Sequence, residues 1–296
     1  MLKSIYAEIY DRRRCILGES PASYGAKNEQ VMWVDILGGK VLFSDLSTSS
    51  MGEFLTNEHT SFVIPRQGGG EVLGTRSGPI LRDFDGNLSN LPIHTKINLD
   101  SCYPESRWND AKVSPYGDLW LGTMTYNAIL GKSNLYRYSS EEQNLVNMLD
   151  KVTISNGMCW SLDRKLFYYI DSEKKTVDVF KVSQNGKDIS SRAILWNISK
   201  DKNIAPDGMT IDSDNGIWVA LWGGSRVVRL DNKGKVTAEV VLPVKKVTSC
   251  CFVGSNSDKL LITTAHMEDQ SDSPLSGMTF ICEPGVQGVP TIAFPY

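Results

Sequence analysis

Long hydrophobic runs are missing from this sequence. No uninterrupted apolar stretch reaches the roughly 18 residues of a membrane-spanning helix. Residues 1–10 contain no apolar run of signal-peptide length, and the three arginines at 12–14 follow them with no hydrophobic segment behind. We therefore expect a soluble, cytoplasmic protein that has no membrane partner.

An excess of charge of either sign is also missing. The 296 residues include 31 basic and 34 acidic side chains, which give a net charge of −3, and no basic stripe stands out. These values give no electrostatic reason to expect a nucleic-acid partner. Hydrophobic residues make up 41% and charged residues 22%, both close to the globular average, so the chain can form a core.

Cysteine does not occur in the spacings of metal sites. The sequence has neither a CxxC nor a Cys/His pattern, so in a reducing compartment we expect buried free thiols, with a disulfide between any pair as the alternative. The six cysteines are Cys15, Cys102, Cys159, Cys250, Cys251 and Cys282.

The three histidines also lie outside any catalytic pattern. We expect His59, His94 and His266 on the surface or in the core, because none belongs to the repeated motif described below. No GxSxG motif accompanies them, which disfavours a Ser-His-Asp hydrolase.

The clearest pattern that is present is a repeat of short strands. Six segments alternate apolar and polar residues or are rich in aromatic and β-branched residues: 31–35, 71–75, 119–122, 166–170, 217–220 and 260–263. Their central residues are 40 to 51 residues apart, and most segments are followed by a turn and a second strand-like segment. Helical periodicity is nearly absent.

A repeat of about 40 to 50 residues made of hairpins is typical of the four-stranded blade of a β-propeller. We therefore predict an all-β fold, a six-bladed β-propeller, in which residues 1–296 form a single domain. For its assembly we expect a monomer or a small homo-oligomer.

A small polar residue precedes three of these strands at a constant distance. Asn109, Asn156 and Asp207 each lie 11 residues before an aromatic residue, which is Trp120, Phe167 and Trp218 respectively. Equivalent positions of repeats around an axis point toward that axis, so we expect the three side chains to converge. The alternative is plain turn chemistry, because Asn and Asp before Gly are common in loops of all-β proteins.

Glu19 is a fourth candidate, although it precedes Trp33 by 14 residues. It fits the pattern if the first loop is longer, with residues 28–30 holding the extra length. Together the four residues offer two carboxylates and two amide oxygens, a set that suits a hard divalent ion such as calcium, magnesium or manganese. Zinc could also bind through the carboxylates.

Seven motifs, in order over nearly the whole chain, resemble those of the senescence marker protein (regucalcin), gluconolactonase and luciferin-regenerating enzyme family. They are Gly18-Glu19-Ser20-Pro21, Arg107-Trp108-Asn109-Asp110-Ala111-Lys112, Gly122-Thr123-Met124, Ser155-Asn156-Gly157-Met158, Tyr169-Ile170-Asp171-Ser172, Pro206-Asp207-Gly208-Met209, and residues 218–227. The resemblance implies a six-bladed propeller with one divalent metal ion near its axis, bound by Glu19, Asn156 and Asp207. It also implies that Arg107 and Asn109 contact the substrate.

The sequence departs from this family at two places. The family usually has an aspartate two residues after Arg-x-Asn-Asp-x-Lys, where Ser114 stands here. Many members carry one or two acidic residues after Gly-Thr-Met, where this chain has Thr125, Tyr126 and Asn127. The metal set is intact while the substrate contacts differ, so the lactone that is accepted stays open.

We predict a metal-dependent lactonase, a gluconolactonase-like hydrolase that opens an aldonolactone to the aldonic acid. The ion, which could be calcium, magnesium, manganese or zinc, would polarise the lactone carbonyl and acidify a bound water. Asp207 is the candidate general base, and Arg107 and Asn109 would orient the sugar hydroxyls. Two alternatives stay open: a non-catalytic propeller that binds a metal or a partner, and a metal-dependent esterase or organophosphate hydrolase on the same scaffold.

Overall fold

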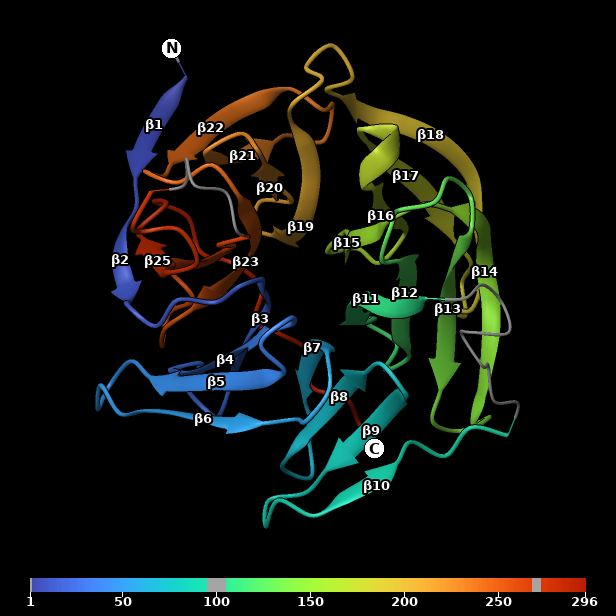
Figure 1. Cartoon of the computed structure of the whole chain (residues 1–296). Coiled ribbons are helices and arrows are strands. Elements are labelled where there is room, and N and C mark those ends of the chain that lie inside the picture. Colours follow the sequence, from blue (N-terminus) through green and yellow to red (C-terminus); the bar gives the residue numbers. More distant parts are fainter. Residues whose placement is uncertain (1, 95–104, 268–272) are drawn as a thin grey trace.

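The computed structural model describes residues 2–94, 105–267 and 273–296, and six sheets surround a central axis as blades (Figure 1). This arrangement confirms the predicted all-β, six-bladed propeller. Each of blades 1 to 4 contains four consecutive strands that pair antiparallel with their neighbours.

The strands of the first four blades follow the chain. Blade 1 consists of β3 (Gly18–Tyr24), β4 (Gln30–Asp35), β5 (Lys40–Asp45) and β6 (Met51–Leu55), and blade 2 of β7 (Thr60–Pro65), β8 (Glu71–Thr75), β9 (Gly78–Arg82) and β10 (Leu88–Asn90). Blade 3 consists of β11 (Ser106–Val113), β12 (Leu119–Thr125), β13 (Ser133–Ser139) and β14 (Asn144–Val152), and blade 4 of β15 (Ser155–Trp160), β16 (Leu166–Asp171), β17 (Thr176–Val182) and β18 (Ile189–Asn197).

Blades 5 and 6 each take a strand from the N-terminal segment, a fifth strand in blade 5 and the fourth strand in blade 6, which the sequence did not predict. Blade 5 consists of β19 (Ala205–Ile211), β20 (Ile217–Trp222), β21 (Arg226–Leu230), β22 (Val236–Val241) and β1 (Lys3–Tyr6), which pairs in parallel with β22. Blade 6 consists of β23 (Val247–Val253), β24 (Lys259–Thr264), β25 (Thr279–Cys282) and β2 (Glu8–Asp11), with Glu8 opposite Ile281. Strands from both ends of the described chain therefore close the ring.

The first two strands of every blade form a hairpin with a loop of five residues. The six loops are 25–29, 66–70, 114–118, 161–165, 212–216 and 254–258. Each turns the chain with residues that accept positive φ, such as Gly117 with a φ of 91° and Asn215 with a φ of 59°. Because the loops are equal in length, equivalent residues of the innermost strands face the axis at the same height.

The core lies mainly between neighbouring blades, and the regularly spaced aromatic residues are part of it. Trp120 of blade 3 packs edge to face on Trp160 of blade 4, with ring centroids 5.6 Å apart. Trp218 of blade 5 packs in the same way on Phe252 of blade 6, at 6.1 Å. The aromatic repeat in the sequence therefore reflects packing that holds adjacent blades together.

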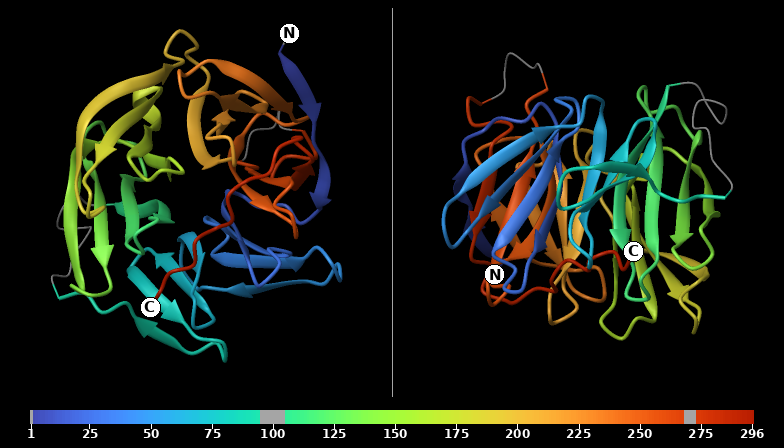
Figure 2. Two further views of the ribbon diagram at one scale, coloured as in Figure 1. Left: turned by 180° about the vertical axis from the view of Figure 1, so that it is seen from behind. Right: turned by 90° about the horizontal axis from the view of Figure 1, so that it is seen from below.

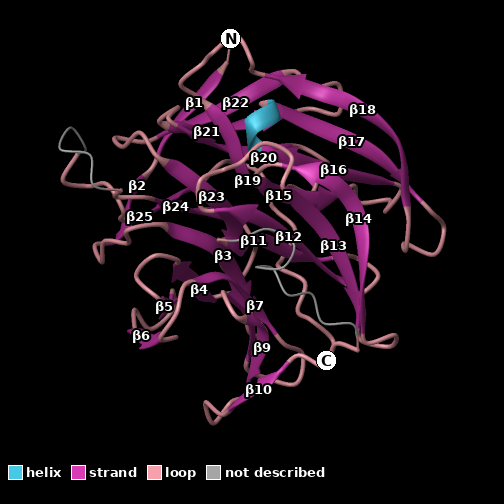
Figure 3. Cartoon of the chain, turned by 45° about the vertical axis from the view of Figure 1, so that its right-hand side comes forward, coloured by secondary structure: helices cyan, strands magenta, loops and turns pink. Residues whose placement is uncertain are grey.

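Almost all regular structure is strand (Figure 3). A 3-10 turn, η1 (Ser172–Lys174), connects β16 and β17. The residues described by the structure include no helix that is long and apolar enough to cross a membrane. Cys15, Cys159, Cys250, Cys251 and Cys282 are free and buried, as expected, whereas Cys102 lies outside the described residues.

The chain after β25 crosses one face of the propeller, as Figure 2 shows; we call residues 283–296 the C-terminal strap. The amide of Val289 donates to the carbonyl of Ile211 in blade 5, and the amide of Phe294 donates to Pro65 in blade 2. Thr291 exchanges hydrogen bonds with Ser23 of blade 1. The strap thus ties blades on both sides of the axis together.

Candidate functional site

All six innermost strands carry a polar residue four positions before their last residue. These residues are Ser20, Ser61, Asn109, Asn156, Asp207 and Ser249. Strand pairing shifts register at or beside each of them. Asn109, Asn156 and Asp207 therefore lie in bulged strands and not in the turns of the alternative interpretation. A bulge re-aims a side chain, which lets these residues reach the axis.

The sequence contained a signal for the three serines that we missed. Ser20, Ser61 and Ser249 also lie 11 residues before the second residue of the following strand, which is Val31, Val72 and Leu260 respectively. These partners are aliphatic, so a search based on aromatic residues did not reveal the other half of the ring.

Our explanation for the spacing of Glu19 was wrong. The loop at 25–29 has five residues like the others, so residues 28–30 hold no extra length. The difference arises because Glu19 lies one position earlier on its strand than Asp207, and Trp33 lies two positions later on its strand than Trp218. Glu19 pairs with Val34, next to the bulge at Ser20.

The structure places all five predicted site residues on the wall of one pocket of about 290 Å³, which we call the front pocket. Glu19, Arg107, Asn109, Asn156 and Asp207 come from blades 1, 3, 4 and 5, and all five side chains are buried. The innermost strands run away from this opening, so their first residues lie nearest to it. The front pocket therefore lies at the axis, at the end opposite the C-terminal strap.

Arg107 and Asn109 form one rigid unit. One terminal nitrogen of Arg107, Nη1, donates to Oδ1 of Asn109 at 2.6 Å and to the carbonyl of Trp108 at 3.0 Å. Nδ2 of Asn109 in turn donates to the carbonyl of Ser155 in blade 4, at 2.7 Å. Nε of Arg107 is buried without a hydrogen-bond partner among the described residues, so this donor is not used within the protein.

Asn156 is held by the turn that follows β16. Its Nδ2 atom donates to Oγ of Ser172 at 2.9 Å, and this hydroxyl donates to the carbonyl of Pro206 at 2.7 Å. Asn156 also acts to lower the pKa of the Asp207 carboxyl, against the larger effects of burial and of the neighbouring carboxylates. Fixing the amide nitrogen in this way presents the other side of the amide, Oδ1, to a ligand.

The buried carboxylates of the site repel one another. Burial and the nearby Asp110 carboxylate raise the pKa of Glu19 to about 8. Burial and the carboxylates of Glu19 and Asp110 raise the pKa of Asp207 well above its usual range. Burial also lowers the pKa of Arg107 to about 10, with carboxylates and Tyr126 nearby acting in the opposite direction. A cation between Glu19 and Asp207 would offset their repulsion.

The chemistry of these donors fits a divalent ion. Across the described ranges, no group of three or more His, Cys, Asp or Glu side chains is placed to hold a metal. The set at Glu19, Asn156 and Asp207 differs because one of its three donors is an amide oxygen. Carboxylate and amide oxygens are the donors that calcium and magnesium prefer, whereas zinc usually takes histidine or cysteine.

Tyr126, which we did not predict as a site residue, lines the front pocket at the point where the sequence departs from the family. Its hydroxyl and Nδ1 of His59 are 2.6 Å apart, and the guanidinium of Arg107 lies 5.7 Å from its ring centroid. Its neighbours Thr125 and Asn127 have other contacts, with the amide of Ile129 and the carboxylate of Glu105. His59 thus supports a site residue, although it does not line the pocket itself.

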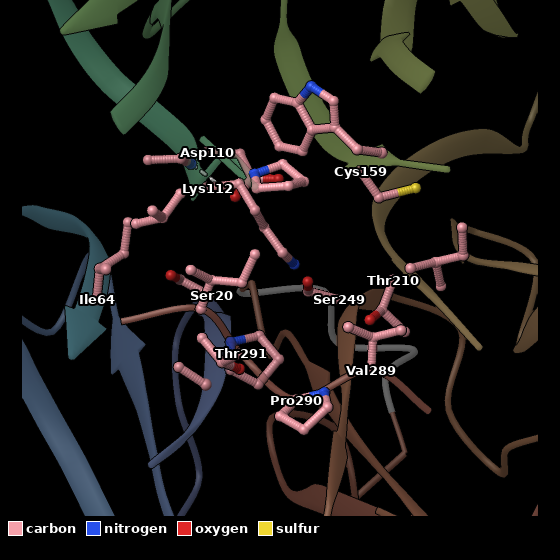
Figure 4. A pocket seen from close by; sticks show the side chains of 18 of the residues that line it. Ser20, Ile64, Asp110, Lys112, Cys159, Thr210, Ser249, Val289, Pro290 and Thr291 are labelled. Atoms are coloured by element: carbon pink, nitrogen blue, oxygen red, sulfur yellow. Dashed lines mark hydrogen bonds between the residues drawn. The ribbon is translucent and has the colours of Figure 1, made fainter. Parts of the chain in front are cut away.

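A second space lies along the same strands, beyond the bulges, and Figure 4 shows it from close by. This back cavity, of about 230 Å³, is lined by Asp110, Lys112, Cys159, Thr210 and Ser249, and by residues 289–292 of the strap. The side chain of Lys112 points into it and donates to the carbonyl of Met209 at 3.2 Å.

Comparison with known proteins places the chain in a family. The model of the SMP-30/gluconolactonase/LRE-like region matches residues 17–266. Regucalcin of Danio rerio is 33% identical over 99% of each chain, and regucalcin of Bos taurus is 36% identical over 100% of this chain and 99% of the other.

Two solved structures show the same fold. A luciferin-regenerating enzyme superposes with a TM-score of 0.88 at 24% identity, over 98% of this chain and 100% of the other. A calcium-binding protein, regucalcin of Agrobacterium tumefaciens, superposes with a TM-score of 0.90 at 23% identity, over 100% of this chain and 99% of the other. On the family match and the full-length relatives together, the chain belongs to the SMP-30/gluconolactonase/LRE family.

Proposed function

We propose that the protein is a divalent-metal-dependent lactonase whose reaction takes place in the front pocket. The observation that carries this proposal is the convergence of two buried carboxylates, an amide oxygen and an unpaired arginine donor at one point on the axis. The relatives support it, because the family model includes gluconolactonases and a solved gluconolactonase of Xanthomonas campestris shares the fold with a TM-score of 0.73. As the sequence predicted, aldonolactones are the first substrates to test.

Glu19, Asn156 and Asp207 would hold the ion. Their oxygen donors favour calcium, magnesium or manganese over zinc. When bound, a divalent ion at this place polarises the carbonyl oxygen of a lactone and offsets the charge of the two carboxylates.

Arg107 and Asn109 have different roles in substrate binding: Arg107 contacts the substrate, and Asn109 positions Arg107. The free Nε–H of Arg107 donates to an oxygen of the lactone. Asn109 acts on Arg107 and not on the substrate directly, because its amide is engaged with Nη1 of Arg107 and with the carbonyl of Ser155. This differs from the predicted role, in which both residues orient sugar hydroxyls.

Asp207 is the candidate general base. Its carboxylate accepts a proton from the attacking water, whose oxygen bonds to the carbonyl carbon. The ring C–O bond then breaks, and the ring oxygen leaves as a hydroxyl because it takes up the proton that Asp207 accepted from the water. One lactone and one water thus give one hydroxy acid.

A pH-indicator screen of aldonolactones tests the activity. Protein treated with a chelator should release no acid above the spontaneous rate, and added calcium, magnesium or manganese should restore release. If no lactone is hydrolysed under any of these conditions, the proposal fails, and a metal- or partner-binding propeller becomes the better interpretation.

Metal analysis tests the ion site separately. We expect one divalent ion per chain in the wild type, and a large loss in Glu19→Gln and Asn156→Ala because each removes a donor. The control is Ser249→Ala, at the same strand position in blade 6 but in the back cavity. Unchanged metal content in both donor variants would refute the assignment.

A further inference from the structure

Among the residues that the structure describes, those around the mouth of the front pocket are apolar. Six partly exposed side chains from four blades surround it: Leu17, Leu37, Ile154, Ala205, Trp222 and Met267. The floor of the pocket is formed by the five polar site residues on β3, β11, β15 and β19. Leu17 lies just before β3, and Trp222 pairs with Ala205, the first residue of β19. They therefore lie between the floor and the opening, where the part of a substrate away from its reacting carbonyl would rest.

The polar groups on this wall already have partners within the protein. The hydroxyl of Ser172 accepts from Asn156 and donates to Pro206. The hydroxyl of Tyr126 is paired with Nδ1 of His59, which leaves its ring as the surface toward the site. Within the described residues, the unpaired Nε–H of Arg107 and the carboxylates of Glu19 and Asp207 all lie at the floor.

This distribution favours one class of substrate over another. A hydroxyl that leaves water for an apolar wall without finding a partner loses its hydrogen bonds to water, which is unfavourable. An alkyl or aryl group in the same place removes apolar surface from water on both sides, which is favourable. An aldonolactone has a hydroxyl on nearly every ring carbon, and the described wall offers few groups to receive them.

We propose that the lactone hydrolysed here carries an alkyl or aryl group in place of ring hydroxyls, and that Trp222 and its apolar neighbours bind that group. This inference rests on the proposed lactonase function and replaces its first choice of substrate. The reaction itself is unchanged: water adds to the carbonyl carbon, the ring C–O bond breaks, and a hydroxy acid is released.

The first measurement compares two lactones of equal ring size on the metal-loaded wild type. These are glucono-δ-lactone and a δ-lactone that carries a pentyl chain and no hydroxyl. We expect kcat/KM to favour the alkyl lactone by on the order of 10²-fold, the discrimination that a pocket reaches from several methylene contacts. Equal or better hydrolysis of the gluconolactone would overturn the inference and leave the lactonase function intact.

Three variants locate the apolar contact. Trp222→Ser should lower the preference for the alkyl lactone by about tenfold, whereas Trp222→Leu should retain most of it because the side chain stays apolar. Leu162→Ser is the matched control, since Leu162 is a 43% exposed apolar residue on the wall of the back cavity. If only Leu162→Ser loses the preference for the alkyl lactone, the substrate binds in the back cavity and not in the front pocket, and the proposal is refuted.

Binding of a non-hydrolysed analogue separates this inference from the lactonase function. The probes are the lactams that correspond to the two lactones, titrated into metal-loaded protein by calorimetry. If the pentyl lactam binds and neither lactone is hydrolysed, the apolar site stands and the lactonase function falls. If the hydroxylated lactam binds as tightly as the pentyl lactam, the inference is wrong whatever the activity.

Discussion

The front pocket and the back cavity share four of the innermost strands, β3, β11, β15 and β19, and successive residues of one strand reach both of them. Asn109 lines the front pocket, and Asp110, the next residue, lines the back cavity. The front collects two carboxylates and a free arginine donor, whereas the back combines Lys112 and hydroxyl groups with the C-terminal strap. The proposed site thus lies at one end of the axis and the C-terminal strap at the other.

This division shows how a repeated scaffold can acquire a single site. The ring of six equivalent positions is symmetric in backbone, but blades 3, 4 and 5 contribute Asn109, Asn156 and Asp207 while the other blades contribute serines. The larger polar side chains reach the front pocket, and two of the serines, Ser20 and Ser249, line the back cavity. Side-chain length and charge at one position therefore decide which blades take part in the site.

The largest effect should come from exchanging Asp207, because it is proposed both to hold the ion and to accept the proton. In Asp207→Asn the amide oxygen can still coordinate, so saturating metal should refill the site. The rate should nevertheless stay about 10²- to 10⁴-fold below that of the wild type, the usual contribution of a general base. Turnover at saturating metal, with metal content measured on the same samples, provides the test.

Ser249→Ala is the matched control, because Ser249 occupies the same strand position in the neighbouring blade. Its turnover should stay within a few-fold of the wild type. Near wild-type turnover of Asp207→Asn under metal saturation would remove Asp207 from the proton transfer and leave it as a ligand only.

A substitution in the C-terminal strap, at the end of the axis opposite the front pocket, should change the stability of the protein and not its turnover. Phe294 of the strap is fully buried beside Tyr138, so Phe294→Ala should lower the free energy of unfolding by about 3–5 kcal/mol. Denaturant unfolding measures this loss, and kcat/KM of the folded fraction should change little. Phe84→Ala serves as control, since Phe84 is 88% exposed; a collapse of kcat/KM in Phe294→Ala would show that the two ends are coupled.

A smaller effect should appear as a pH dependence of the metal-free protein. The folded protein keeps a proton on Glu19 up to about pH 8, whereas the unfolded chain loses it near its ordinary pKa of about 4. Between these values the folded state binds more protons, so its stability should fall as the pH rises. The melting temperature in chelator should therefore drop by several degrees across this range.

Glu19→Gln should weaken this pH dependence and leave the part that the raised pKa of Asp207 contributes. Saturating divalent ion should abolish it in the wild type by offsetting the charge. A melting temperature that rises from pH 5 to pH 8 in chelator would contradict the proposed burial of an uncompensated carboxylate.

Sequence reasoning succeeded where a local rule repeats. Asn109, Asn156 and Asp207 could be found because equal loops and strands keep the distance to Trp120 and its counterparts constant. Sequence reasoning failed where the residues are common in any sequence or where a contact joins residues that are far apart in the chain. The serines are too common to stand out, and the site contact of Tyr126 depends on a partner, His59, that is 67 residues away in the chain.

The pairing of the N-terminal strands had no local signal either. The register of β1 with β22 and of β2 with β25 follows from closure of the ring, not from the alternation of residues within each strand. The C-terminal strap lacks a strand pattern because its contacts are isolated bridges to several blades, such as Phe294 with Arg66 and Gly288 with Asp212.

The pairing of Glu8 with Ile281 also has a consequence for how the protein is made. Contacts between residues so distant in the chain form late, and folds dominated by them fold slowly. During synthesis β2 emerges early but has no partner until β25 is complete. Blade 6 lies between blades 5 and 1, so Asp207 and Glu19 are brought to their final separation only when this pairing forms. The event that completes the ring therefore also completes the pair of carboxylates, and a nascent chain passes most of its synthesis without the proposed ion site.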